Sequence, residues 1–169
     1  MVIALVLASS PATAAESSYK AISLPLHARA INAAGQVVGD AAGSGHAFLW
    51  DAVNGMKDLG TLGGNGSRPF GINAAGQVVG AAGTASGDSH AFLWDRGSMV
   101  DLNKLIAAIA PGSAGAGVDE AAGINDAGQI LCSGSITGSG TVLLTPSIQI
   151  EITGAHMRSD HELEIRTRR

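Results

Sequence analysis

Internal repetition is the feature that most constrains the fold of this 169-residue chain. Residues 31–39 and 72–80 both read Ile-Asn-Ala-Ala-Gly-Gln-Val-Val-Gly, and residues 124–131 carry the variant Ile-Asn-Asp-Ala-Gly-Gln-Ile-Leu. A second segment, His-Ala-Phe-Leu-Trp-Asp, occupies residues 46–51 and again 90–95. The offsets are 41 residues (31 to 72), 44 (46 to 90) and 52 (72 to 124), near the period of repeats of about 40–50 residues that form β-structure. The chain is therefore expected to repeat one supersecondary unit.

Each repeat carries the signals of short antiparallel strands. Asn-Ala-Ala-Gly between two apolar segments is typical of a hairpin in which Asn bonds to the backbone and Gly is left-handed. We therefore expect a positive φ at Gly35 and Gly76. Residues 46–51 have apolar side chains at both sets of alternating positions, as in a strand covered on both faces. Asn54-Gly55 follows, and this pair is a strong hairpin signal.

The predicted fold class is all-β, with about three four-stranded antiparallel repeat units. The units span about 19–51, 56–95 and 99–145 within one domain, 15–146. Four strands per unit is the format of a β-propeller blade, but three blades are fewer than propellers typically have. The fold is thus expected to be β-propeller-like, and either incomplete or closed by association. A three-fold barrel, a trefoil and a prism are the alternatives.

One segment departs from the β pattern. Residues 101–110 have an apolar spacing that suits about two helical turns, and Pro111-Gly112 should end that helix. The helix accounts for the longer offset between the second and third repeats.

The outer faces of the terminal units raise the question of closure. They are expected to carry the apolar side chains of Phe48, Trp50, Val142 and Leu144. A large apolar patch seldom stays exposed on a monomer. We therefore expect either self-association through the terminal units or a compact three-fold form, with the aromatic pairs between sheets in both cases.

Composition excludes several classes of function. Charged residues make up 14% of the chain and the formal net charge is −4, whereas a nucleic-acid-binding surface needs a basic stripe. A hydrophobic content of 46% is too high for a disordered acidic chain. Cys132 is the only cysteine, so an intramolecular disulfide and a Cys-based zinc site are both excluded.

The two ends of the chain differ from the repeats. Residues 1–14 hold a short apolar run and an Ala-x-Ala site, which predict a truncated secretory signal cleaved near Ala14-Ala15; a buried strand is the alternative. The mature protein is then secreted, periplasmic or extracellular, and it has no membrane span, because the apolar run is far shorter than the ~20 residues a span needs. Residues 147–169 form a charged tail that we expect to be solvated and disordered, apart from a possible edge strand at 148–152.

The order of the motifs resembles that of a known family. Gly-Ile-Asn-x-x-Gly-Gln-Val-Val-Gly, His-Ala-Phe-Leu-Trp-Asp and Asp-Leu-Gly-Thr-Leu-Gly-Gly alternate over residues 19–146, and this pattern resembles the HAF-repeat family of predicted extracellular bacterial repeat proteins. The ending in Leu-Leu-Thr-Pro at 143–146 is similar to that family's last unit. The third unit departs at 131–132 and 141–143. The resemblance implies export and a repeated fold, and it brings no catalytic residues.

Two histidines are the most tempting candidates for chemistry. His46 and His90 occupy equivalent positions in two units, but the third unit lacks this His, so a symmetric ring of metal ligands would be incomplete. We expect each to be half-buried and hydrogen-bonded to a neighbouring blade. Four recurring aspartates are expected to bond to turns and strand ends, with a calcium site as the alternative. These aspartates are Asp51, Asp95, Asp58 and Asp101.

Other candidates give weaker signals. His156, His161 and Glu162 lie in the charged tail, where a metal site is still less expected. Residues 65–67 read Asn-Gly-Ser, a glycosylation sequon that matters only in a host that modifies such sites. The sequence lacks G-x-S-x-G, P-loop and H-E-x-x-H motifs. It therefore assigns no catalytic, cofactor-binding or metal-ligating residues.

Two classes of function compete. The first, which we favour, is an exported non-enzymatic β-repeat protein that acts as a cell-surface or extracellular binding or interaction module, with a glycan or a surface protein as partner. The alternative is a fragment of a propeller-type enzyme or sensor with its site at one end of the channel. Recurrent loops and few charges favour the first class, whereas a cluster of carboxylates with perturbed pKa values would favour the second.

Overall fold

The computed structural model describes most of the repeat region. The described residues are 20–24, 27–41, 43–109, 117–135 and 139–146, with the short segments 156–157 and 163–164. The expected signal segment 1–14, the residues that should end the helix at 111–112 and the strand expected at 148–152 lie outside them.

Three antiparallel sheets make up the body of the molecule. Sheet 1 contains β1 (His27–Ile31), β2 (Val37–Asp40), β3 (Ala47–Asp51) and β4 (Gly55–Asp58). Sheet 2 contains β5 (Gly63–Ile72), β6 (Val78–Thr84), β7 (Ser89–Asp95) and β8 (Ser98–Asp101). Sheet 3 contains β9 (Gly117–Ile124), β10 (Ile130–Ser135) and β11 (Ser139–Leu144), and α1 (Leu102–Ile109) precedes it. In the tail, β12 (His156–Met157) pairs with β13 (Leu163–Glu164).

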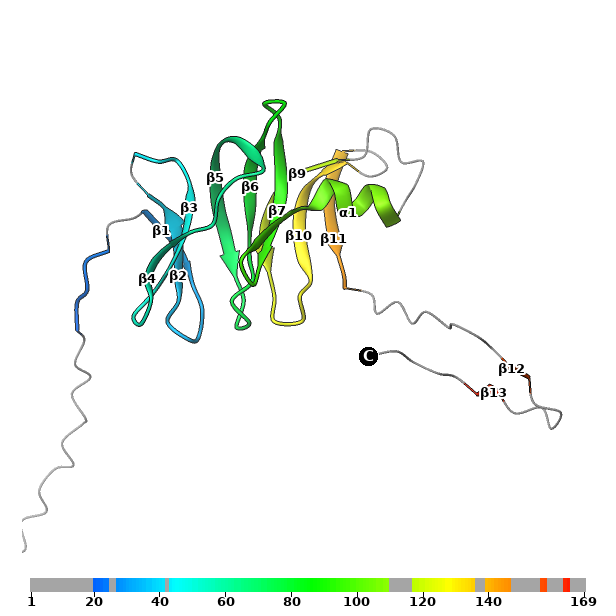
Figure 1. The fold of residues 1–169 in the computed structure, drawn as a ribbon, viewed down its shortest axis with the longest axis horizontal. Coiled ribbons are helices and arrows are strands. Elements are labelled where there is room, and N and C mark those ends of the chain that lie inside the picture. Colours follow the sequence, from blue (N-terminus) through cyan, green and yellow to red (C-terminus); the bar gives the residue numbers. More distant parts are fainter. Residues whose placement is uncertain are drawn as a thin grey trace, which may run out of the picture.

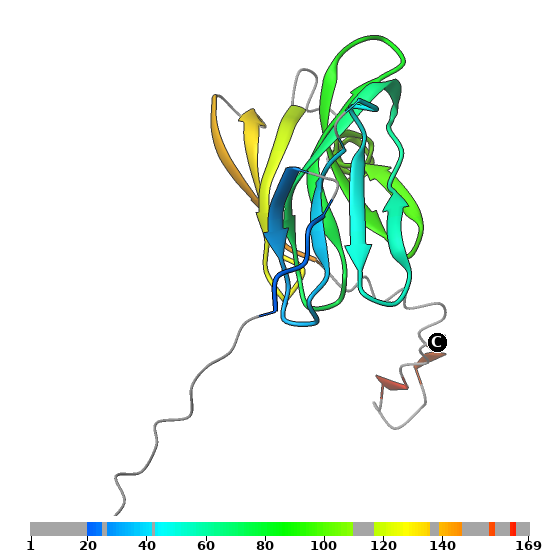
Figure 2. The ribbon, with the colours of Figure 1, turned by 90° about the vertical axis from the view of Figure 1, so that its left-hand side faces the viewer.

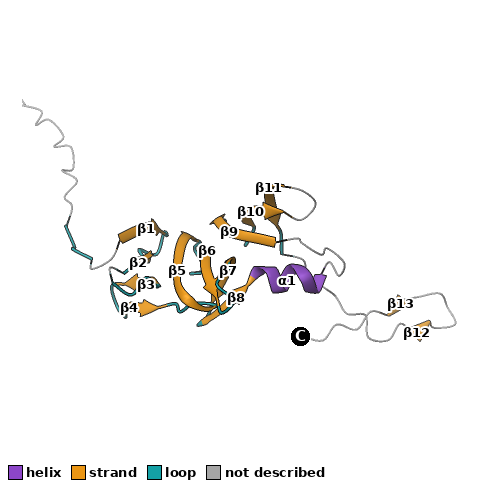
Figure 3. Ribbon diagram, turned by 90° about the horizontal axis from the view of Figure 1, so that it is seen from above, coloured by secondary structure: helices purple, strands orange, loops and turns teal. Residues whose placement is uncertain are grey.

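The sheets stand in a row in sequence order (Figures 1 and 3). Figure 2, seen from the side of sheet 1, shows them one behind another with their strands running in the same general direction. The first strand of each later sheet makes the junction: β5 packs against β1, β2 and β3, and β9 packs against β5, β6 and β7. None of the three sheets closes into a barrel. The prediction of all-β repeat units is confirmed, and the described residues do not form the barrel alternative.

The sheets are out of phase with the sequence units by one strand. Strand β4 pairs with β3, so it completes sheet 1, although the sequence units begin at that strand. Strand β8 completes sheet 2 in the same way. Sheet 3 contains three strands among the described residues instead of the expected four.

The repeated Asn-x-x-Gly segments form the expected turns. Gly35, Gly76 and Gly128 have φ values of 76°, 79° and 76°. In each turn the Gly amide donates to the Asn carbonyl three residues earlier, and the Asn amide donates to the Gln carbonyl four residues later. The expectation of left-handed glycines is confirmed, because this turn needs a residue that tolerates positive φ.

Each sheet has a forward face, turned toward the next sheet, and a rear face, turned toward the preceding one. The core between sheets 1 and 2 joins the forward side chains of Val38, Ala47 and Leu49 to the rear side chains of Phe92 and Trp94. The core between sheets 2 and 3 has the same construction, and its forward residues from sheet 2 include Val79 and Ala91. Sheet 2 is therefore apolar on both faces because it is covered on both. The same covering was expected for residues 46–51, but Phe48 and Trp50 on the rear face of β3 are only half-buried.

One expectation about the outer faces was wrong. Val142 and Leu144 pack against the core between sheets 2 and 3, so they do not lie on the outer face of the third unit. Leu143, which points the other way, is exposed. The reason is that the sheets stack in one direction, so the same strand parity faces rearward in every unit. The alternating set of side chains that includes Phe48 and Trp50 therefore lies on the outer face of sheet 1, whereas the equivalent set in sheet 3 faces the core.

Helix α1 fits beside the second core. Leu102 and Ile106, four residues apart on one side of the helix, are buried in that core. The Asp101 carboxylate caps the first turn by accepting from the Asn103 amide at 2.9 Å. The Asn103 side chain accepts from the Val118 amide at 2.6 Å and donates to the Val118 carbonyl at 3.2 Å. The helix expected from the apolar spacing is therefore present, and it links sheets 2 and 3. No helix in the described ranges is both long enough and apolar enough to cross a membrane.

Candidate ligand-binding pocket

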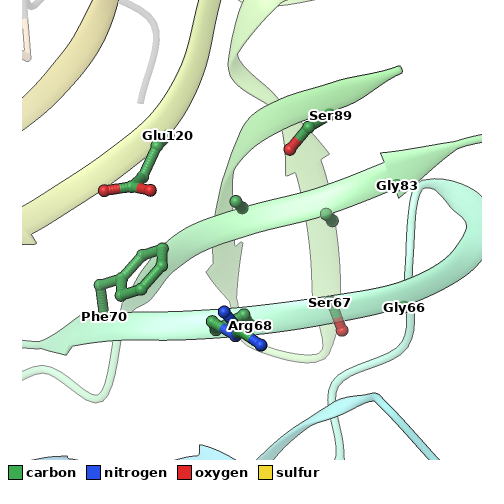
Figure 4. Close-up of a pocket in the computed structure, with 9 residues that line it drawn as sticks. Gly66, Ser67, Arg68, Phe70, Gly83, Ser89 and Glu120 are labelled. Carbon is green, nitrogen blue, oxygen red and sulfur yellow. The ribbon is translucent and has the colours of Figure 1, made fainter. Parts of the chain in front are cut away.

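A shallow hollow of about 350 Å³ opens where β5, β6, β7 and β9 meet (Figure 4). Small residues of β6 make its floor, and longer side chains of the first strands, β5 and β9, stand around it. The lining residues are Gly66, Ser67, Arg68, Phe70, Ala81, Ala82, Gly83, Ser89 and Glu120. The hollow thus combines a cation, a carboxylate, the hydroxyl group of Ser89 and an aromatic ring.

Strand alternation and two register shifts position the residues of β5. Ser67 and Pro69 are buried, whereas Arg68 is exposed and Phe70 is half-buried. The pairing of β5 with β6 shifts register between Gly63 and Ser67 and again between Pro69 and Gly71. Such irregularities bend a strand and redirect its side chains, and they occur often beside functional sites.

Ser67 fixes the strand behind the pocket. Its hydroxyl accepts from the Ala47 amide at 2.9 Å and donates to the Gly60 carbonyl. Its own amide donates to the Gly45 carbonyl at 2.9 Å. Because these three partners belong to sheet 1 and the segment that leaves it, β5 is held rigidly against the neighbouring sheet. The Ser67 of the glycosylation sequon is therefore buried and engaged in the fold.

Charged side chains extend from the pocket toward sheet 1. The Arg29 guanidinium lies 5.7 Å from the centre of the Phe70 ring, within the range of a cation–π interaction. Arg29 also forms an ion pair with Asp40. Burial alone would raise the pKa of the Asp40 carboxyl, but the hydrogen bond and charge of Arg29 hold that pKa below its usual value of 3.8. The charge of Arg68 lowers it further.

Arg68 and Glu120 occupy a variable position shortly before the constant Ile-Asn-x-x-Gly-Gln segment. The sheet registers place His27, Arg68 and Glu120 at one equivalent position of the three first strands. Sequence reasoning missed Arg68 and Glu120 because it searched for recurring residues. The signal that could have found them is the reverse: a polar position that changes from unit to unit four residues before the constant Ile-Asn pair.

The two candidate histidines occupy equivalent structural positions. His46 Nδ1 lies 2.9 Å from Asp58 Oδ2, and His90 Nδ1 lies 3.0 Å from Asp101 Oδ2. Both aspartates end the adjacent strand of the same sheet. Each aspartate belongs to the next of the expected sequence units but to the same sheet as its histidine, because the β3–β4 and β7–β8 hairpins bring a carboxylate beside each ring.

The recurring aspartates bond to turns and strand ends, as expected. Asp51 accepts from the amides of Val53 and Asn54 and from the Asn54 side chain, and these bonds lower the pKa of its carboxyl. Burial opposes ionisation of Asp58, but the amide of Gly60, together with the His46 ring, holds the pKa of the Asp58 carboxyl below its usual value.

The other two recurring aspartates bond to a glutamine side chain and to a helix end. Asp95 accepts from the Gln77 side-chain amide at 3.4 Å, and Asp101 caps α1. Within the described ranges, no three His, Cys, Asp or Glu side chains form a cluster that could hold a metal ion. His161 and Glu162 lie outside those ranges.

Comparison with family models, with curated proteins and with solved structures finds no match to this chain.

Proposed function

We propose that this chain is a non-enzymatic binding module that takes a small polar ligand of the saccharide class in the pocket between β5 and β9. The observation that carries the proposal is that an exposed Arg68, a carboxylate at Glu120 and the ring of Phe70 line one hollow. A sugar ring offers hydroxyl groups to charged donors and acceptors and an apolar C–H face to an aromatic ring. A few polar groups that converge on a partly apolar hollow of this size are typical of small-ligand sites.

The surroundings of the pocket support a binding role over a mobile catalytic one. Strand β5 is anchored by the three hydrogen bonds of Ser67, and Phe70 is flanked by the Arg29 guanidinium. A site on rigid strands binds with little ordering cost. The predicted secretory signal and the resemblance to the HAF-repeat family support an extracellular setting, where glycans are abundant ligands.

Calorimetric titration of the full chain with two probes tests the proposal: oligomers of a neutral hexose and oligomers of a hexuronic acid. One probe is expected to bind, and Arg68→Gln and Phe70→Ala should each weaken its binding about tenfold or more, as expected for the loss of a charged hydrogen bond or a stacked ring. Lys104→Gln, an exposed change on α1, is the matched control and should leave binding unaltered. Failure of both probes, or equal affinity in all variants, would refute the proposal.

A further inference from the structure

A ladder of asparagine side chains runs through the three repeated turns in one direction. Asn32 Nδ2 donates to the Asn73 carbonyl of the next unit at 3.0 Å, and Asn73 Nδ2 donates to the Asn125 carbonyl at 3.2 Å. Each unit thus gives a hydrogen bond to the unit that follows it. At the two ends of the described structure, Asn125 has no following unit to donate to, and the Asn32 carbonyl receives only the Gly35 amide of its own turn.

In the first two units a glutamine lies near the turn glycine of the next unit. A Cβ placed on Gly76 would stand 3.2 Å from Gln36 Oε1, and one on Gly128 would stand 4.0 Å from Gln77 Oε1 and 3.1 Å from Pro146 Cγ of its own unit. No described atom lies within 4 Å of the same point on Gly35. The turn glycine of the first unit therefore lacks the neighbouring side chains that lie over the turn glycines of the other two units.

The rear face of sheet 1 is uncovered at positions that are covered in the other sheets. Ile31 has 67% of its surface exposed, whereas the equivalent Ile72 and Ile124 pack against the cores behind them. Phe48 and Trp50 on the same face are only half-buried, and their equivalents in sheet 2 are buried.

The forward face of sheet 3 is uncovered in the complementary way. Leu131 is 45% exposed, although the equivalent Val38 and Val79 are both fully buried by the sheet that follows them. Leu143 is 60% exposed, whereas the equivalent Leu49 is buried. Both leucines stand where an internal interface of this molecule would place its core.

From these observations we propose that a second copy of this chain docks head to tail, with the forward face of sheet 3 of one copy against the rear face of sheet 1 of the other. Leu131 and Leu143 then meet Ile31, Phe48 and Trp50, in the manner of the interface between sheets 1 and 2. The two surfaces differ from one another, so the contact is heterologous and continues the internal repeat.

The polar ladder continues across the same junction. Asn125 donates to the Asn32 carbonyl of the second copy, and Gln129 covers its Gly35. A heterologous contact forms a ring when its rotation closes. Two copies supply six sheets, within the range of about four to eight blades found in closed propellers, so the expected assembly is a closed dimer.

Sedimentation equilibrium of the full chain, over a wide range of concentration, measures the assembly. The expected mass is twice the 16.8 kDa of one chain. Ile31→Lys alone, and Leu131→Glu with Leu143→Glu, should each reduce the mass to that of one chain, because these exposed positions tolerate a charge in the monomer but not in the interface. Val53→Lys changes a still more exposed apolar residue, in the β3–β4 turn; it is the control and should leave the dimer intact.

Mixing the two monomeric variants tests the direction of docking. The Ile31→Lys chain keeps a native forward face and the Leu131→Glu, Leu143→Glu chain keeps a native rear face, so an equimolar mixture should regain the double mass through one native junction and one Lys–Glu junction. A native chain that stays monomeric would overturn the proposal. That result would mean that solvent or another segment of the same chain covers these faces. A dimer that survives either variant, or a mixture that stays monomeric, would overturn it as well. Circular dichroism of each variant confirms that it is folded.

Discussion

At the scale of single residues, the turns follow rules that the sequence makes visible, whereas the partners of charged side chains do not. The φ of 79° at Gly76 could be expected from the Asn-Ala-Ala-Gly pattern alone, because only glycine adopts that conformation without strain. The partner of His46 could not, because its carboxylate, Asp58, is brought close by a hairpin twelve residues long. The residues next to one another in the sequence determine the backbone conformation of a turn better than they determine which side chains from different strands come into contact.

The first prediction concerns the left-handed glycines. Gly76→Val should lower the free energy of unfolding by about 1–2 kcal/mol, because a β-branched side chain is forced into positive φ. Its Cβ would also press on Gln36 Oε1 at 3.2 Å. Denaturant unfolding measures the change. Gly123→Ala is the control, since that glycine has an ordinary φ and open space for a Cβ; equal stability of the Gly76→Val and native proteins would contradict the turn.

The second prediction concerns acid stability. The pKa of Asp40 in the folded chain lies below its usual value of 3.8, so the ionised carboxylate favours the folded state. This contribution is fully present above the unfolded pKa and is lost as the pH falls through the folded one. In Asp40→Asn, thermal stability should be lower at neutral pH and should fall less steeply below about pH 4. Identical pH profiles for the native chain and this variant would exclude the ion pair with Arg29 as a source of stability.

At the scale of elements, the repeat predicted the strands but not their grouping. The alternation in residues 46–51, repeated at 90–95, indicated strands covered on both faces. Strand β7 is covered on both, with Phe92 in one core and Ala91 in the other, whereas Phe48 and Trp50 of β3 are only half-buried. The assignment of β4 to sheet 1 depends on hydrogen bonds between strands. A repeated sequence can be divided into units at more than one strand, so it does not show which four strands share a sheet. The inward direction of Val142 depends on the stacking order of whole sheets, which no local pattern contains.

The third prediction concerns helix α1. Ile106 is 3% exposed and belongs to the core between sheets 2 and 3. Ile106→Ala should destabilise the protein by about 2–4 kcal/mol through lost burial and the cavity that remains. Leu105→Ala is the matched control, because Leu105 is exposed on the same helix and should cost well under half as much. Denaturant unfolding compares the two; equal losses would mean that the helix does not pack on this core.

At the scale of the whole molecule, the sheets form a one-directional stack. Every internal junction joins a forward face to a rear face, which explains why equivalent residues such as Trp50 and Trp94 differ in burial. The stack also explains why Arg68 and Glu120 were missed. They lie on the first strands, where neighbouring units meet, and the hollow that they line is formed by two sheets together. The repeat length and strand pattern specify the unit, whereas the site arises from the differences between units.

Quenching of tryptophan fluorescence by acrylamide tests this stack most directly. Trp50→Phe leaves Trp94 as the only tryptophan, and Trp94→Phe leaves Trp50; both variants carry Ile31→Lys so that each is measured as a single chain. Trp94 is 6% exposed behind sheet 1, and the Lys57 ammonium lies 4.8 Å from the centre of its ring. The one-directional stack predicts weak quenching of Trp94 and clearly stronger quenching of Trp50. Equal quenching of the two, or stronger quenching of Trp94, would contradict it.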